Sequence, residues 1–155
     1  MEYRIRTIGV IHTGFANKDD APIQGAFQPD AEGTVELFAE FAEGLRDIEL
    51  FSHIILIYHF DRSGKVQLVR TPFLDDTPHG IFATRHPCRP NGIGMTIVRL
   101  MGREGNILHV LGADVLDSTP LLDIKPYVPR FDSFPDASEG WLAGKERRDK
   151  PPGRE

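Results

Sequence analysis

Short apolar segments, each bounded by turn-forming residues, dominate this chain and restrict the folds available to it. Seven of them are separated by Gly, Pro, Asp and Asn: residues 5–11, 33–37, 53–60, 66–69, 81–84, 93–100 and 107–115. Segments of this length that are rich in β-branched and aromatic residues predict strands, and their spacing is typical of an all-β sandwich or barrel. We therefore expect an all-β fold, a small closed or partly open β-barrel of about seven strands.

Helical signals are few and short. Apolar side chains recur at helical spacing at Phe38, Phe41, Leu45 and Ile48, which we expect to belong to the core. Residues 136–144 predict one or two turns near the end, so the fold should contain one or two short helices. The domain is expected to cover residues 1–144, followed by a charged, Pro- and Gly-rich tail over residues 145–155 that we expect to be flexible.

Composition excludes several classes of protein. The longest apolar runs are far shorter than the roughly 20 residues of a membrane helix, and a signal peptide is not apparent, so we expect a cytoplasmic protein without membrane contact. The net charge of −5 argues against a globally basic nucleic-acid binder, although several arginines could still gather on one face. The six histidines form no metal-binding spacing, so we expect no metal. His53 and His59 are expected to be core residues.

Two stretches, residues 80–95 and 116–129, combine shape-fixing and reactive residues. Gly and Pro fix the backbone there, and polar side chains stand between them: Arg85, His86, Arg89, Asn91, Asp117, Thr119, Asp123 and Lys125. Such a mixture is typical of rigid loops that direct side chains towards a ligand. We predict that the two stretches are the two walls of one small-molecule site.

Five motifs occur in an order that resembles a known family. They are IGVIHTGF (8–15), PIQG (22–25), GLRDIELFSHIILIYHF (44–60), GIFATRHPCRPNGIG (80–94) and LDSTPLLDIKPYVP (116–129). The chain resembles the TsaA-like (YaeB-like) family of S-adenosylmethionine-binding β-barrels, whose characterised bacterial members are tRNA methyltransferase O. The resemblance covers roughly residues 4–141. Several long motifs in order are far more specific than one short signature.

The resemblance implies that S-adenosylmethionine is the cofactor. The implied cofactor-binding positions are Pro22, Ile23, Gln24, Asp61, Arg62, Arg85, Met95, Asp117, Ser118, Thr119 and Pro120. Their chemistry agrees in part, since Arg85 can bind a carboxylate or stack on adenine and Asp117 can accept from hydroxyls or an ammonium group. The family pattern also implies a homodimer with its cofactor sites at or near the subunit interface.

The resemblance favours an enzyme that methylates N6 of threonylcarbamoyl-adenosine beside the anticodon of a tRNA. Arg89 and Asn91 are the candidates for contact with the methyl acceptor. Two alternatives stay open: a non-catalytic S-adenosylmethionine sensor or regulator, and a methyltransferase for a small metabolite. An arginine-rich face would favour the enzyme and an acidic rim the sensor.

Some residues depart from the family pattern, and several have structural alternatives. Gly92 stands where the family usually has proline, Ser118 where it has glycine, and Asp61-Arg62 where the tRNA-modifying members have His-Gln. Arg85 and Arg89 could instead form internal pairs, Asn91 could only shape a turn, and Cys88 could only pack. Asp123 and Lys125 could simply pair with each other.

Overall fold

The computed structural model describes residues 1–17 and 28–146, which fold into two compact units. The first, called here the barrel unit, comprises Met1–Asp61 and Ile93–Tyr127. The second, called here the loop unit, comprises Arg62–Gly92 and Val128–Glu155. Both units are built from segments distant in sequence, and the boundaries of the predicted domain stay a prediction.

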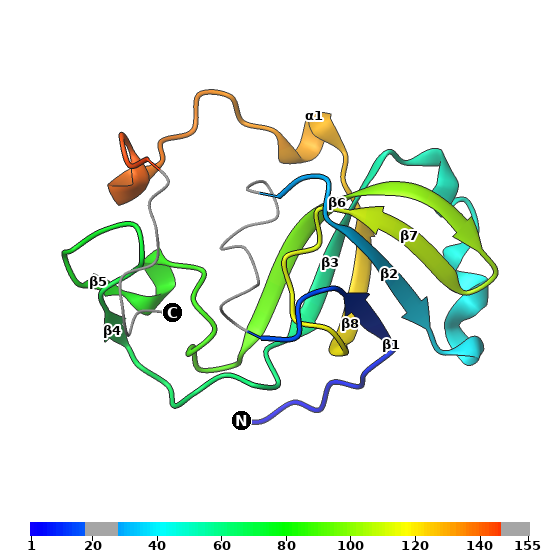
Figure 1. Cartoon of the computed structure of the whole chain (residues 1–155), viewed down its shortest axis with the longest axis horizontal. Coiled ribbons are helices and arrows are strands. Elements are labelled where there is room, and N and C mark those ends of the chain that lie inside the picture. The colour runs from blue at the N-terminus through cyan, green and yellow to red at the C-terminus, as the bar shows by residue number, and fades with distance from the viewer. Residues whose placement is uncertain (18–27, 147–155) are drawn as a thin grey trace. The chain divides into compact units, whose positions relative to one another are not determined.

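A closed antiparallel β-barrel forms the first unit (Figure 1). Its strands follow one another around the barrel in the order β1-β2-β7-β6-β3-β8. Their bounds are β1 Gly9–Thr13, β2 Glu32–Leu37, β3 His53–His59, β6 Ile93–Glu104, β7 Ile107–Leu111 and β8 Thr119–Pro126. Closure leaves no unpaired edge, which is how a small barrel avoids pairing with other chains. The predicted all-β barrel is confirmed.

Alternation along the strands builds the barrel core. Every second residue points inward and is buried, among them Ile11, Val35, Ile54, Leu56, Val98, Leu108, Val110 and Leu121. On β3 the alternate positions face outward, and these include His53 and His59. The expectation that these two histidines are core residues is therefore wrong, because their register puts them on the outer face: His59 is exposed and His53 half-buried.

Two 3-10 turns follow β2: η2 Ala39–Leu45 and η3 Ile48–Leu50. Leu45 is buried, and Phe41 and Ile48 pack against the core as expected. Phe38 does not belong to the core, since 41% of it is exposed. It precedes η2 in an extended conformation, so it does not share the buried face of the turns.

The loop unit is mostly irregular. It contains the two-stranded sheet of β4 (Val69–Arg70) and β5 (His79–Gly80), the 3-10 turns η4 (Ile81–Ala83) and η5 (Gly140–Leu142), and the single helical turn α1 (Pro129–Asp132). The η5 turn lies within the stretch predicted to be helical. Residues 81–83 form η4, so the strand predicted over residues 81–84 is wrong, because the periodicity of a short apolar run does not distinguish a strand from a helical turn.

Register brings four strand ends to one end of the barrel. Tyr58, near the end of β3, pairs with Gly94 at the start of β6 and with Leu121 near the start of β8. Ile11, near the end of β1, pairs with Thr119. The ends of β1 and β3 and the starts of β6 and β8 therefore lie at the same end, called here the loop end of the barrel.

Candidate functional site

Several predicted cofactor-binding residues gather at the loop end of the barrel. Asp61 follows β3, Met95 lies at the start of β6, and Asp117 and Ser118 precede β8. Thr119 is the buried first residue of β8, and Pro120 next to it pairs with Val10 of β1. These positions lie in three separate parts of the sequence, and only the barrel register brings them to one end.

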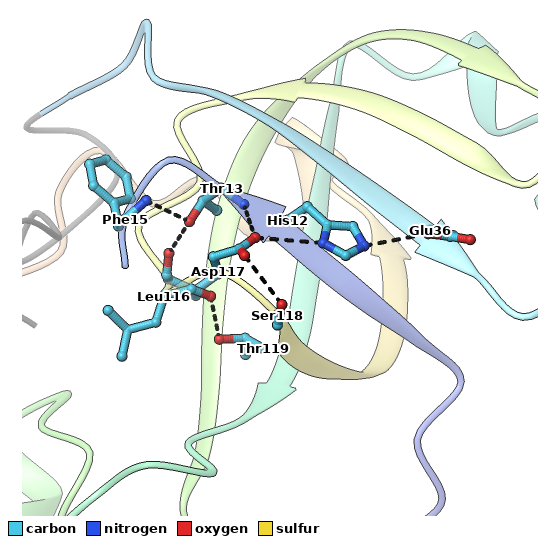
Figure 2. Close-up of polar contacts among 9 residues, drawn as sticks. His12, Thr13, Phe15, Glu36, Leu116, Asp117, Ser118 and Thr119 are labelled. Carbon is cyan, nitrogen blue, oxygen red and sulfur yellow. Dashed lines mark hydrogen bonds and ion pairs between the residues drawn. The ribbon is translucent and has the colours of Figure 1, made fainter. Parts of the chain in front are cut away.

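The Asp117 loop is attached to the end of β1 by a set of hydrogen bonds (Figure 2). The backbone N–H of Thr13 donates to Asp117 Oδ1 at 3.0 Å, and the backbone N–H of Asp117 donates to the Phe15 carbonyl at 2.8 Å. Thr13 Oγ1 donates to the Val115 carbonyl at 2.8 Å, and Thr119 Oγ1 donates to the Leu116 carbonyl at 2.6 Å. The loop is therefore fixed at both ends by groups that cannot easily move.

His12 was not among the residues expected from the sequence, and it contacts two carboxylates. Figure 2 shows its ring between Asp117 and Glu36, with Nδ1 3.5 Å from Asp117 Oδ1 and Nε2 3.4 Å from Glu36 Oε2. Alternation in β1 buries Gly9 and Ile11, so His12 must face outward towards the neighbouring β2. That alternation, together with the polar Glu36 on β2, was the signal available in the sequence.

Asp117 is held in its ionised form. The Thr13 N–H is the main cause that lowers the pKa of this carboxyl group below its ordinary value, while the Ser118 hydroxyl and His12 act in the same direction and burial opposes them. Ser118 Oγ lies 3.2 Å from Asp117 Oδ2. A carboxylate oxygen can accept more than one hydrogen bond, so Oδ2 retains capacity for a ligand hydroxyl or ammonium group.

In the loop unit, residues 84–92 form a loop that is held by hydrogen bonds within itself and to neighbouring segments. Thr84 Oγ1 donates to the Ile81 carbonyl at 2.9 Å and accepts from the His86 N–H at 3.3 Å. His86 Nδ1 accepts from the Cys88 N–H at 3.1 Å. Cys88 is buried, and its carbonyl accepts from the Gln67 N–H. The packing alternative for Cys88 thus fits what the structure shows.

Arg89 and Arg85 occupy different surroundings in this loop. Arg89 Nη1 donates to the carbonyls of Thr84 at 2.9 Å and of His86 at 3.3 Å, so this half-buried side chain fastens the loop from within. Arg85 lies between those two carbonyls in sequence and is exposed, as is Asn91. Contact of Arg89 and Asn91 with a methyl acceptor stays a prediction, and the same loop supplies the exposed Arg85.

The remaining predicted residues are less informative. Pro22, Ile23 and Gln24 lie outside the described residues, and Arg62 is the first residue of the loop unit. Asp123 and Lys125 pair at 2.9 Å on β8, as the structural alternative expected. Within residues 1–17 and 28–146 there is no group of three or more acidic, His or Cys side chains that could hold a metal ion. In the same residues, none of the helical segments has the length and apolar character needed to cross a membrane.

The first unit is thus a small closed antiparallel β-barrel whose loop end presents an anchored carboxylate. Residues 10–133 match the family described as the tRNA-methyltransferase O N-terminal domain. This match covers more than half of the chain, which therefore belongs to that family.

Relatives with different descriptions share this domain. A protein of Pyrococcus abyssi described as a probable S-adenosyl-L-methionine-binding protein is 56% identical over 88% of this chain and 74% of its own length. The tRNA (adenine(37)-N6)-methyltransferase of Escherichia coli is 36% identical over 90% of this chain. The crystal structure of TrmO from Pseudomonas aeruginosa superposes with a TM-score of 0.77 at 40% identity, covering 91% of this chain. This chain spans 63% of the length of both the Escherichia coli and the Pseudomonas aeruginosa chain.

Proposed function

We propose that this chain binds S-adenosylmethionine, with Asp117, Thr119 and Arg85 among its ligands. The observation that carries the proposal is the Asp117 carboxylate, which is anchored by Thr13, held ionised and still able to accept on Oδ2. A ribose hydroxyl or the ammonium group of the methionine part satisfies such an acceptor. The description of the Pyrococcus abyssi relative as a probable S-adenosyl-L-methionine-binding protein supports the same ligand.

The protein groups have positioning roles in this proposal. When bound, S-adenosylmethionine supplies a methyl group activated by the sulfonium charge. Asp117 holds a hydroxyl or ammonium group, and Arg85 can bind a carboxylate through two parallel N–H donors. Methyl transfer needs no covalent protein nucleophile, so the main contribution of the protein is to align donor and acceptor. Fixed loops suit that task better than mobile ones, because misalignment by about 1 Å can lower the rate a hundredfold.

We further propose that the methyl acceptor is the N6 of threonylcarbamoyl-adenosine next to the anticodon of a tRNA, which implies a cytoplasmic location. The Escherichia coli relative, named for tRNA adenine methylation, supports this proposal. The charge of the segment 62–92 also supports a tRNA acceptor, since this segment carries five Lys and Arg residues against two Asp residues. Of these five, Arg62, Lys65 and Arg85 are exposed, and exposed cations suit phosphate contacts, which supply much of the affinity for nucleic acid.

Transfer of labelled methyl groups tests the reaction. Purified protein, labelled S-adenosylmethionine and bulk tRNA from a strain that lacks the gene should give labelled tRNA, whereas tRNA from the parent strain should take up much less label because it is already modified. The acceptor site is then read by nucleoside analysis. Equal labelling of both tRNA pools would contradict the proposed acceptor, and failure to label either pool, with cofactor binding established, would contradict the tRNA reaction.

A sensor or regulator that binds S-adenosylmethionine without turnover is the second candidate. One observation favours it: the described part of the barrel unit, residues 1–17, 28–61 and 93–127, holds thirteen acidic residues against six Lys and Arg residues. An acidic surface repels phosphates and disfavours RNA. The labelling experiment separates the candidates, because the sensor binds cofactor and transfers no methyl group to tRNA.

We also propose that the chain forms a homodimer with its cofactor sites at or near the subunit interface. A two-fold partner can add a wall to a site that one small barrel leaves shallow. Light scattering should give about twice the 17.4 kDa of one chain at micromolar concentration. A monomer that still binds the cofactor at full strength would contradict the shared site.

A further inference from the structure

A second polar cluster lies in the loop unit. Its centre is Trp141, the single tryptophan of the chain, which lies in η5. The indole Nε1–H donates to the Ala83 carbonyl at 2.7 Å across 58 residues of sequence. The indole ring also stacks on the imidazole of His79, with ring centres 4.6 Å apart and planes 14° apart. One side chain thus joins η5 to the segment that leads into the Arg85 loop.

An ion-pair network holds the same two segments together. Asp75 Oδ2 lies 2.8 Å from His79 Nε2, and Asp75 Oδ1 lies 3.0 Å from Lys145 Nζ. The Asp75 and His79 side chains are only 13% and 19% exposed, so water screens this network less than a surface pair. The bond from His79, and then the one from Lys145, hold the pKa of Asp75 well below its usual range. The ion pair between Lys145 and Asp75 therefore adds to the hydrogen bond between Trp141 and Ala83.

The hydrogen bond from Trp141 to the Ala83 carbonyl matters because η4, which ends at Ala83, is short. Three residues in a 3-10 turn gain little stability from their own hydrogen bonds, which here are the two that Thr84 gives to the Ile81 carbonyl. Ala83 is the last residue of η4, and Arg85 follows two positions later. A donor that fixes the Ala83 carbonyl therefore fixes the backbone that enters the Arg85 loop. From Thr84 onward, the backbone of the loop is held by the bonds that Arg89 and His86 make.

We propose that Trp141 and Lys145 are positioning residues that hold the Arg85 loop in the geometry needed to bind the cofactor. This proposal rests on the proposed S-adenosylmethionine binding. Both residues lie beyond residues 10–133, which are those matched to the family. The affinity for the cofactor is therefore set in part by a segment outside the matched domain, through contacts with Ala83 and Asp75.

Two conservative substitutions test the proposal. Trp141→Phe keeps an aromatic ring against His79 and removes the N–H donor, while Lys145→Gln removes the charge and leaves a slightly shorter polar side chain. Each variant should bind S-adenosylmethionine about 3- to 10-fold more weakly by calorimetry, the loss expected for one net hydrogen bond. The unfolding midpoint of the barrel should stay at the wild-type value, because the barrel core is untouched. Glu139→Gln, in the exposed segment before η5, is the matched control and should bind like the wild type.

Amide hydrogen exchange supplies a readout that does not depend on the cofactor. In Trp141→Phe the amides of Thr84 and His86, which bond within this loop, should exchange faster than in the wild type, and barrel amides should not change. In the wild type, the cofactor should shift the emission of Trp141. A ligand that favours one geometry of the Arg85 loop also favours the Trp141 contacts that hold this geometry. If the wild type binds no S-adenosylmethionine, the proposed function fails and the exchange measurement alone decides on the positioning role. Unchanged exchange in Trp141→Phe, or wild-type affinity in both variants, would overturn the proposal.

Discussion

An Arg85→Ala, Asp117→Ala double variant is expected to lose most of its affinity for S-adenosylmethionine. Each side chain is proposed to make a charge-assisted contact, and removing one such contact costs about 1.5–3 kcal/mol. Two losses together correspond to binding weaker by roughly a hundredfold or more. Calorimetry on the wild type and the double variant measures the difference, and wild-type affinity in the double variant would remove this assignment of the ligands.

A matched control removes one cation and one carboxylate elsewhere on the barrel unit. Arg46 and Glu43 form an exposed pair at 3.2 Å, so an Arg46→Ala, Glu43→Ala variant should bind the cofactor like the wild type. Asp117→Asn separates two roles of the aspartate, because the amide oxygen can still accept from Thr13 but carries no charge. Full binding by Asp117→Asn would show that the residue acts only as an anchor for its loop.

The second large effect is expected on stability, at Gly9 in β1. A Cβ at this position would overlap the Glu36 carbonyl oxygen and lie 3.0 Å from the Leu37 Cα, both backbone atoms of the paired strand β2. Because backbone cannot rotate away as a side chain can, Gly9→Ala must displace a strand of the closed barrel. We expect a loss of about 1–3 kcal/mol in the free energy of unfolding, which corresponds to a midpoint lower by roughly 3–10 °C.

Gly102→Ala is the control for this prediction. Gly102 also lies in a barrel strand, β6, but a Cβ there would meet no atom within 4 Å. Thermal unfolding followed by circular dichroism compares the two variants. Equal midpoints for Gly9→Ala and Gly102→Ala would show that the β1–β2 pair has more room than its register implies.

Short apolar segments bounded by turn-forming residues were enough to predict most of the barrel from the sequence. The alternation of buried and outward positions was not visible in β3, because its residues are apolar at both kinds of position, and His53 and His59 were therefore placed in the core. The strand β8 was missed, because Pro120 and Pro126 suggested a rigid loop. Proline is tolerated there since both residues lie near strand ends, where fewer ladder hydrogen bonds are required.

The candidate site was less accessible from sequence than the fold. Gly and Pro identified the stretches that contain Asp117 and Arg85, because residues that fix backbone shape are visible without a structure. The anchoring of Asp117 by a backbone N–H of Thr13 depends on a contact between residues 104 positions apart. Sequence reasoning likewise assigned Arg89 to a methyl acceptor, whereas the structure adds its bonds to two carbonyls of its own loop. Such partners depend on tertiary contacts that periodicity does not encode.

Ser118 limits how the Asp117 loop can diverge among related sequences. Its φ of 65° lies in the left-handed region, where a residue with a Cβ is disfavoured by about 1–2 kcal/mol and glycine is not. Its hydroxyl bond to Asp117 offsets part of this cost. Although exposed, the position should accept glycine, asparagine or aspartate and reject valine or isoleucine. The backbone of this loop therefore restricts sequence drift at a surface position where packing imposes no restriction.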